Sequence, residues 1–203
     1  MLQRDAPRLV LASGSASRRA LLQAAGLRFE TRAPGVDEAA VKTAARIEGT
    51  GAEQAALLLA ELKAAQVARN EPGALVIGAD QILVCRGIWF DKPADIQDAR
   101  AQLEALRGET HRLATAAVCM LDGRRVWHYV ATPHLTMRAF TDTFLAAYLD
   151  AEGDGVLGSV GCYRLEGLGA HLFEHVDGEH AAILGLPLLP LLGFLRQYAV
   201  LAG

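Results

Sequence analysis

Short apolar runs alternate with amphipathic stretches along most of the chain. Arg8 to Ala12 is typical of a buried strand, and Arg18 opens a helical pattern that ends at Gly26. Leu27 to Thr31 has the composition of another strand, and the stretch from Pro34 to Glu38 is predicted to be a loop. A strand, a helix and a second strand are therefore expected near the N-terminus.

The middle of the chain predicts one long helix followed by strands. Thr50 to Glu53 has the spacing of a capping box, and the Ala- and Leu-rich run Ala55 to Ala68 follows it. Two β-type runs, Leu75 to Ala79 and Ile82 to Cys85, are interrupted by the polar pair Asp80-Gln81. Because polar side chains inside an apolar run are costly to bury, this pair needs a structural or chemical reason.

The second half predicts further helices and a β-hairpin that turns at Asp122-Gly123, a dipeptide typical of tight turns. The expected elements are a helix over Ile96 to Leu106, strands over His111 to Leu121 and Val126 to Phe140, a helix over Thr141 to Leu149, an extended segment over Cys162 to Val176, and a helix over Pro187 to Tyr198. This order of elements indicates an α/β fold, with a mixed β-sheet flanked by helices.

Length and composition narrow the class of protein. A chain of 203 residues with 52% hydrophobic composition can bury one sizeable core, and a single domain is the simplest interpretation. The net charge of -3 argues against a general surface for nucleic acid or anionic membrane, so an anionic ligand has to meet a local basic site. The longest apolar stretch, Leu184 to Leu195, is too short to span a bilayer, and no signal peptide is recognisable.

The cysteines add a prediction about the compartment. The three cysteines are far apart in the sequence and form no Cys-x-x-Cys pair, which favours neither a disulfide framework nor a zinc knuckle. A reducing compartment fits this pattern best. We therefore expect a soluble, cytoplasmic protein.

The segment Ser13 to Arg19 is a candidate anion site. It places hydroxyls and backbone N–H groups at a helix N-terminus, where unpaired donors and partial positive charge favour an anion. Arg18 and Arg19 could add bidentate contacts to phosphate oxygens. The alternative is that Ser15 or Ser17 only caps the helix while the arginines lie in solvent. No Gly-Lys-Ser/Thr follows, so the segment is not a Walker A loop.

Several charged residues are candidates for chemistry, each with a simpler alternative. Asp80 is a possible catalytic or metal-binding carboxylate, or an aspartate at a strand end that bonds to nearby backbone. Glu38 and Lys63 could supply a further carboxylate and a phosphate-binding ammonium, although such residues are usually solvated. Lys92, held by the stiff Pro93, could neutralise a transferring phosphoryl group, or could be a plain turn lysine.

The segment from His171 to His175 matches the His-x-x-Glu-His pattern of inverted zinc peptidases. That mechanism needs both histidines on one helical face. Gly167 and Gly169 precede the pattern and Gly178 closes it, and the alternation of its side chains is typical of a strand. A zinc peptidase is therefore a remote alternative.

Taken in order, these segments resemble the Maf, or septum-formation-inhibitor-like, family of nucleotide pyrophosphatases over nearly the whole chain. The matching stretches are Leu11 to Leu22, Val36-Asp37-Glu38, Lys63-Ala64, Ile77 to Gln81, Lys92-Pro93, Thr115, Tyr163 to Gly167 and Gly185 to Leu188. Ordered matches at this many sites are specific, whereas no single one would be.

The resemblance implies one Maf-like domain over residues 1–203, with two lobes around a central nucleotide cleft. It implies hydrolysis of the α–β phosphoanhydride of modified or non-standard nucleoside triphosphates, with Mg²⁺ or Mn²⁺ as cofactor. By family position, Asp80 would be the general base, and Glu38 would hold the metal with it. The residues that would bind the substrate are Ser13, Arg18, Arg19, Lys63, Lys92, Gln81 and Glu166. A homodimer is also implied, and the alternative function is a non-catalytic, nucleotide-binding regulator of cell division.

Three positions bear on which nucleobase the substrate carries. Gln81 stands where much of the family has Thr, and Glu166 stands where it has Gln; both resemble the branch that acts on 7-methyl-GTP. That branch usually has Pro-Trp where this chain has Ala16-Ser17, and the aromatic side chain would be a natural stacking partner for a cationic methylated purine. The resemblance therefore implies that Ser17, Gln81 and Glu166 set specificity.

Overall fold

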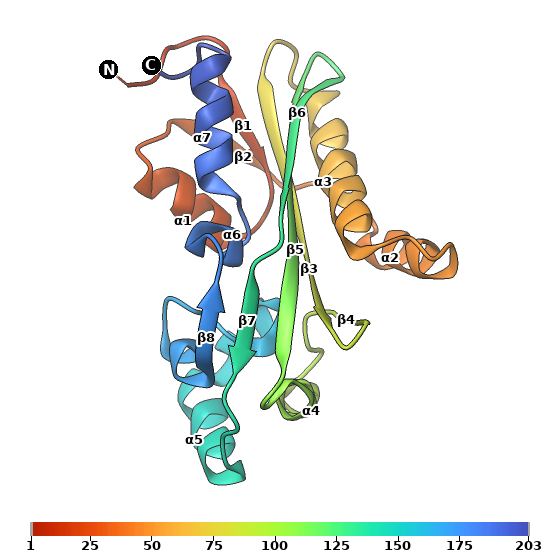
Figure 1. Cartoon of the computed structure of the whole chain (residues 1–203). Coiled ribbons are helices and arrows are strands. Elements are labelled where there is room, and N and C mark those ends of the chain that lie inside the picture. Colours follow the sequence, from red (N-terminus) through yellow and green to blue (C-terminus); the bar gives the residue numbers. More distant parts are fainter. Residues whose placement is uncertain (1, 203) are drawn as a thin grey trace. The chain divides into compact units, whose positions relative to one another are not determined.

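The computed structural model describes residues 2–202, which divide into two compact units (Figure 1). Within the described residues, the first unit contains residues 2–81, 115–131 and 180–202, and the second contains residues 82–114 and 132–179. Strands β3 (Leu75–Cys85) and β5 (Thr110–Leu121) run from one unit into the other. Each unit is described below by itself.

The first unit is built on parallel strands. β1 (Leu9–Ala12) pairs in parallel with β2 (Phe29–Arg32) on one side and with the start of β3 on the other. The end of β5 pairs antiparallel with β6 (Arg124–Ala131) across the predicted turn at Asp122-Gly123, where both residues have positive φ. The presence of both pairings confirms the predicted mixed sheet of an α/β fold.

Helices cover both faces of these strands. α1 (Ala16–Ala24) and α7 (Leu188–Gln197) lie on one side, and α3 (Ala52–Ala68) lies on the other (Figure 1). The core beneath α1 and α7 includes the odd-numbered residues Leu75, Ile77 and Ala79 of β3. Because successive side chains of a strand point to opposite faces, the even-numbered residues of β3 face α3.

The contact between β3 and α3 depends on Gly78. A Cβ atom at Gly78 would lie 2.2 Å from the carbonyl oxygen of Ala60 and 2.8 Å from the Cβ atom of Ala64. Only glycine therefore lets the helix backbone approach the strand this closely. This approach brings Lys63 of the helix next to Asp80 of the strand.

The second unit combines antiparallel strands with short helices. β3 pairs antiparallel with β4, and β7 pairs antiparallel with both β5 and β8. Its elements are β4 (Ile88–Phe90), α4 (Ile96–Leu106), β7 (His134–Met137), α5 (Asp142–Glu152), β8 (Phe173–Asp177), and 3-10 helices over Gly153–Gly158, Val160–Cys162 and Leu168–Leu172. In its interior, Nε2 of His111 lies 2.8 Å from the hydroxyl of Tyr163.

The loop predicted up to Glu38 is confirmed for residues 34–37, whereas the capping box at Thr50 was wrong. Glu38 is the first residue of a helix, α2 (Glu38–Ile47), whose N-cap Asp37 accepts a hydrogen bond from the backbone N–H of Ala40. α2 is amphipathic although most of its side chains are exposed, and no helix was predicted over these residues. α3 begins after Gly51, without a side-chain cap.

Other predicted elements changed at their boundaries. β3 continues through Asp80-Gln81 without interruption. The strand predicted over Val126 to Phe140 divides into β6 and β7 around Pro133, which has no N–H to donate to a sheet. Only the end of the segment from Cys162 to Val176 is a strand, and the rest is mostly 3-10 helix. The helices α4, α5 and α7 confirm their predictions, with a short α6 (His180–Ile183) preceding α7.

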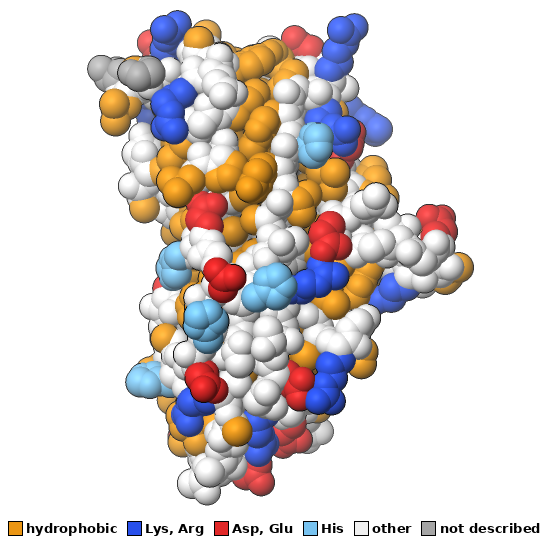
Figure 2. All heavy atoms as spheres, viewed as in Figure 1, with side chains coloured by type: hydrophobic (Ala, Val, Ile, Leu, Met, Phe, Trp, Pro, Cys, Tyr) orange, Lys and Arg blue, Asp and Glu red, His pale blue; other side chains and the backbone are white. Residues whose placement is uncertain are grey.

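Aromatic side chains form a row on the surface of the first unit. The rings of Trp127 and Phe194 stack at 5.3 Å between centroids, and Tyr129 and Tyr198 extend the row at either end. Figure 2 shows hydrophobic side chains gathered where α7 and β6 lie. The row covers the core at this point and leaves both tyrosines partly exposed.

Two broader expectations can be compared with the structure. All three cysteines are buried and free. Throughout residues 2–202, no helix combines the length and the hydropathy that crossing a membrane requires.

Candidate active site

Asp80 forms a buried ion pair with Lys63. The Asp80 side chain lies on the face of β3 that α3 covers, and the residue is 3% exposed. Its Oδ1 atom lies 2.6 Å from Nζ of Lys63, which is buried as well. A carboxylate at this depth needs a charged partner, and α3 supplies one. The alternative of an aspartate that bonds to backbone at a strand end is therefore wrong.

Glu38 shares the same ammonium group. Its Oε1 atom lies 2.7 Å from Nζ of Lys63, so one lysine joins two carboxylates. The Glu38 side chain is 47% exposed and lies at the start of α2. Partial burial alone would raise the pKa of Glu38, but the hydrogen bond and charge of Lys63, with the charges of Lys42 and Arg18, lower it. Glu38 is therefore an ionised carboxylate at neutral pH.

Lys42 is a further cation at this site that the sequence analysis missed. It lies four residues after Glu38 on α2, it is buried, and its charge helps to lower the pKa of Glu38. Residues four apart on a helix are neighbours, so a helix at this position would have pointed to Lys42. It was overlooked because no helix was predicted after Glu38.

Ser13 and the N-terminus of α1 lie at the same end of the parallel strands as Asp80. Ala12 pairs with Gly78, so the chain leaves β1 at Ser13 level with the part of β3 that leads to Asp80. The carboxyl ends of parallel strands are the usual position of ligands in α/β sheets. Ser13 Oγ accepts hydrogen bonds from the backbone N–H of Ser15 at 3.1 Å and from Nη1 of Arg18 at 3.3 Å. Its own hydroxyl hydrogen therefore remains available to a ligand.

Arg18 is the buried arginine of this segment. Its Nε atom donates to the carbonyl oxygen of Gly185 at 2.8 Å. Burial lowers the pKa of Arg18, while the charges of Asp80 and Glu38 raise it in part. The usual pKa of arginine is so high that the guanidinium stays charged at neutral pH. Arg18 thus belongs to the same charged group as Asp80 and Glu38.

The two readings of the Ser13 to Arg19 segment each hold in part. Ser15 does cap α1, since its Oγ accepts from the backbone N–H of Arg18 at 3.4 Å. Arg19 is exposed on α1, as the capping alternative expects, whereas Arg18 is not. Ser17, predicted to affect specificity, lies half-buried in the first turn of α1.

Gly185 controls the space beside Arg18. Its φ is +105°, a conformation that side-chain-bearing residues rarely adopt, and a Cβ atom there would lie 3.3 Å from Nε of Arg18. The residue therefore has to be glycine for Arg18 to reach its carbonyl oxygen. Gly185 was part of the family resemblance, but the sequence contained no signal for this contact between residues so far apart.

Gln81 lies on the opposite face of β3 from Asp80. Its Nε2 atom lies 2.8 Å from Oγ1 of Thr115, 3.0 Å from the carbonyl oxygen of Ala182 and 3.1 Å from that of Ile183. Thr115 in turn donates to Ala182 at 3.0 Å. A polar network therefore anchors the residue next to Asp80 along the chain.

The structure brings most of the predicted site residues into one unit. The residues that gather in the first unit are Ser13, Arg18, Glu38, Lys63, Asp80 and Gln81. Lys92 and Glu166 are exposed residues of the second unit. Their assignment to substrate binding stays a prediction.

The zinc-peptidase motif does not have the geometry that it needs. His171 lies in a 3-10 helix and His175 lies in β8, so the two histidines do not share a helical face. The stretch that does form a strand, Phe173–Asp177, agrees with the alternation in the sequence. Across the part of the chain that the structure describes, no group of three or more His, Cys, Asp or Glu side chains could hold a metal ion.

Asp80 and Glu38 still fit a divalent cation that binds together with a phosphate ligand. Oδ2 of Asp80 is buried and has no hydrogen-bond partner among the described residues. Carboxylate oxygens suit Mg²⁺, which proteins usually hold through one or two carboxylates plus substrate phosphates and water. Two carboxylates that share one lysine match this arrangement better than they match a metal site in which every ligand comes from the protein.

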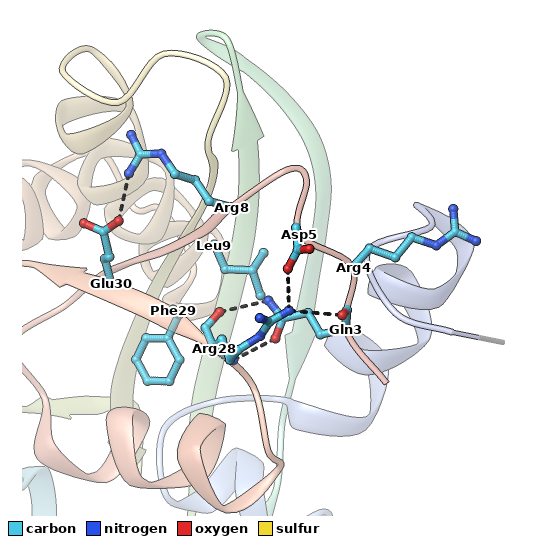
Figure 3. A pocket seen from close by; sticks show the side chains of 8 residues that line it. All are labelled: Gln3, Arg4, Asp5, Arg8, Leu9, Arg28, Phe29 and Glu30. Atoms are coloured by element: carbon cyan, nitrogen blue, oxygen red, sulfur yellow. Dashed lines mark hydrogen bonds and ion pairs between the residues drawn. The ribbon is translucent and has the colours of Figure 1, made fainter. Parts of the chain in front are cut away.

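A separate pocket lies at the other end of β1, as Figure 3 shows. Arg28 donates to Oδ1 of Asp5 at 2.9 Å, and Arg8 donates to Oε1 of Glu30 at 3.2 Å. Because these guanidinium groups are already paired with carboxylates, this pocket is a weaker binding site for an anion than the segment after Ser13. We therefore place the candidate site at Asp80.

Comparison with known proteins decides the family. A family model described as Maf-like protein matches residues 8–198. The chain belongs to the Maf family. The match of this Maf chain extends over both units, which confirms the resemblance seen in the ordered motifs.

Individual relatives of this Maf chain are similar over almost their whole length. It is 52% identical over 194 residues to a nucleoside triphosphate pyrophosphatase from Granulibacter bethesdensis, with 96% of this chain and 98% of the relative covered. It is 54% identical over 188 residues to a nucleoside triphosphate pyrophosphatase from Paramagnetospirillum magneticum, with coverage of 93% and 97%. It is 45% identical over 197 residues to a 7-methyl-GTP pyrophosphatase from Rhizobium etli, with coverage of 97% and 99%.

Proposed function

We propose that this protein is a nucleoside triphosphate pyrophosphatase, which hydrolyses the bond between the α- and β-phosphates and releases a nucleoside monophosphate and pyrophosphate. The observation that carries the proposal is the group of Asp80, Lys63 and Glu38, with one ammonium between two carboxylates. The names of similar proteins, which include two pyrophosphatase activities, support the same reaction.

Basic groups around this pair suit a triphosphate. Arg18, Lys63 and Lys42 are buried cations, and all three act on the ionisation of Glu38. The Ser13 hydroxyl and the free N–H groups of the first turn of α1 add hydrogen-bond donors. Such a local group allows a protein of net charge -3 to bind a polyanion.

Asp80 is suited to activate water. Lys63 occupies Oδ1 of Asp80, which leaves the unpartnered Oδ2 as the atom that can accept a proton from an attacking water. The same hydrogen bond fixes the orientation of the carboxylate. Lys63 therefore both positions the base and offsets negative charge next to the substrate phosphates.

We assign Asp80 and Glu38 as the residues that would hold a divalent cation, Mg²⁺ or Mn²⁺. Such a cation, when bound, lowers the pKa of a water and neutralises charge that develops on the phosphates. Lys63 keeps the two carboxylates close together, and the lowered pKa of Glu38 keeps that group ionised and ready to bind a cation.

The substrates in our proposal are modified or non-standard nucleotides, with 7-methyl-GTP among them. The support for 7-methyl-GTP is the similarity to a protein of that activity together with the residues Gln81 and Glu166. Ser17, Arg19 and Lys92 keep the roles in specificity and substrate binding that the family resemblance implies. A homodimer, a cytoplasmic location and a single two-lobed domain also remain predictions from the sequence.

Pyrophosphate release from a panel of nucleotides tests the proposed function. The panel is 7-methyl-GTP, dTTP, UTP, CTP, ITP and GTP, each with Mg²⁺ or Mn²⁺, for the wild type, Asp80→Asn and the exposed control Asp150→Asn. We expect turnover by the wild type and the control, and a loss of at least about a hundredfold in Asp80→Asn because it lacks the base. Thermal stabilisation by nucleotides without any turnover would instead support a non-catalytic regulator.

A further inference from the structure

The carboxamide of Gln81 has a fixed orientation. Its Nε2 atom faces three oxygen atoms at 2.8 to 3.1 Å, and two of them are the backbone carbonyls of Ala182 and Ile183. A carbonyl oxygen only accepts hydrogen bonds, so the nitrogen and not the oxygen of the amide has to face this cluster. Rotation of the amide by half a turn would place its oxygen against three oxygens.

Thr115 completes this arrangement. The residue is fully buried, and its hydroxyl donates to the carbonyl oxygen of Ala182 at 3.0 Å. Since its only hydrogen is used there, Oγ1 of Thr115 can act toward Gln81 only as an acceptor. The hydroxyl and the two carbonyls therefore bind both hydrogens of the Gln81 amide, and each bond supports the same orientation.

The oxygen of this amide is the only polar atom that Gln81 can offer to a ligand. No hydrogen bond of the described residues involves Oε1 of Gln81, and the residue is half-buried rather than enclosed. Gln81 lies on the opposite face of β3 from Asp80, but its partners Ala182 and Ile183 belong to the same segment as Gly185, whose carbonyl oxygen accepts from Arg18. Gln81 therefore lies on the side of the sheet that holds Arg18. A freely rotating amide could meet either a donor or an acceptor, whereas this one can meet only a donor.

We propose that Gln81 acts on the substrate solely as a hydrogen-bond acceptor, and that Thr115 is the positioning residue that fixes this role. This inference rests on the proposed pyrophosphatase function. The matching group on the substrate is an N–H or O–H donor, either the ring N–H of an oxo-purine or oxo-pyrimidine base or a ribose hydroxyl. A site built to bond such a donor discriminates against analogues that lack it.

Matched substrates separate the two sources of the donor. Inosine triphosphate carries a ring N–H, purine riboside triphosphate lacks it, and 2′,3′-dideoxyinosine triphosphate keeps it without the ribose hydroxyls. The values of kcat/KM for the three are measured with the wild type, Gln81→Met, Thr115→Val and Thr115→Ser. Ratios between substrates are the readout, because general damage to the fold lowers all three values together.

A base donor predicts that the wild type prefers inosine triphosphate to purine riboside triphosphate. Gln81→Met then reduces this preference by about five- to tenfold, the effect of one hydrogen bond. Thr115→Val reduces it in the same direction by about threefold, and Thr115→Ser, which keeps the hydroxyl, preserves it. If Gln81→Met instead changes the ratio of kcat/KM between inosine triphosphate and its dideoxy analogue, the donor is a ribose hydroxyl. The role of Gln81 as an acceptor still stands in that case.

The outcomes for the inference and for the proposed function are distinct. Wild-type turnover with both ratios unchanged in Gln81→Met overturns the inference and leaves the pyrophosphatase function in place. The absence of wild-type turnover on every nucleotide overturns the proposed function, and the inference with it. If Gln81→Met does not fold, the comparison of Thr115→Val with Thr115→Ser gives the same decision.

Discussion

Asp80 and Lys63 form a buried ion pair between a strand and a helix, with Oδ1 and Nζ 2.6 Å apart. The pair explains why an aspartate interrupts the apolar sequence of β3. It exists because Gly78, two residues earlier on the same face, allows α3 to pack directly on the strand. A backbone contact thus sets the geometry of the candidate base.

Loss of one member of this pair should destabilise the protein strongly. Lys63→Met leaves Asp80 buried without its partner, and we expect a decrease of about 3–5 kcal/mol in the free energy of unfolding. The double variant Lys63→Met/Asp80→Asn should recover much of this loss, since it removes the uncompensated charge. Urea unfolding measures the free energy of unfolding of both variants. Glu61→Gln, which breaks the exposed pair with Arg125, is the control and should cost less than about 1 kcal/mol. Equal losses in Lys63→Met and the control would contradict the buried pair.

A side chain at position 78 should separate α3 from β3. In Gly78→Ala the new methyl group would meet the carbonyl oxygen of Ala60 at 2.2 Å, so the helix has to move. We expect a loss of stability of about 1–3 kcal/mol or more, together with reduced turnover, because Lys63 moves with the helix. Gly193→Ala is the matched control, since a Cβ atom there meets nothing within 4 Å and the residue lies in α7. A Gly78→Ala variant with the same melting temperature and activity as the wild type would refute the close packing.

Gly185→Ala should weaken the binding of phosphate through Arg18. The substitution strains a backbone with φ +105° and pushes a methyl group toward Nε of Arg18. We expect KM for the nucleotide to rise at least about tenfold, the effect of one lost charge-assisted hydrogen bond, with a smaller change in kcat. Steady-state kinetics checks the expectation, with Gly193→Ala as the control because a Cβ atom there has open space. A KM that does not change would show that Arg18 does not depend on Gly185.

Stability should depend on pH through His111 in the second unit. Burial, helped by the charge of His134, lowers the pKa of His111 from 6.5 to about 4 in the folded protein. The unfolded chain therefore takes up a proton at a higher pH than the folded protein does, so stability falls as the pH decreases from about 6.5 toward 4. The total loss attributable to this group is on the order of 3 kcal/mol.

Melting temperatures of the wild type and His111→Phe between pH 7.5 and 4.5 test this expectation. His111→Phe removes both the titrating group and the hydrogen bond to Tyr163, so it should be less stable at pH 7.5 but lose less stability on acidification. The exposed His128 provides the control His128→Phe, which should follow the wild type. Parallel pH curves for the wild type and His111→Phe would contradict a buried neutral His111.

The sequence predicted most of the helices and the chemically unusual residues more reliably than the contacts between them. Asp80 stood out because it interrupts an apolar run, and Ser13 and Arg18 stood out because they begin a helix. Lys42 was missed because no helix was predicted over α2, although this exposed helix separates polar from apolar side chains. When a helix is not predicted, the charged residues that its first turns bring together are therefore missed as well.

Contacts between distant segments could not be predicted from local sequence. The close approach at Gly78, the bond from Arg18 to Gly185 and the network of Gln81 with Thr115 all join residues that only the folded chain brings together. Local patterns depend on spacing along one element, whereas these contacts depend on how strands and helices pack. The family resemblance marked several of these positions without giving their physical roles.

The identity of the products tests the central claim most directly. The wild-type protein is incubated with 7-methyl-GTP or dTTP and Mg²⁺ or Mn²⁺, and ³¹P NMR follows the phosphorus-containing products over time. Our account predicts a nucleoside monophosphate and pyrophosphate in equal amounts, because hydrolysis occurs between the α- and β-phosphates. A nucleoside diphosphate with inorganic phosphate would contradict it.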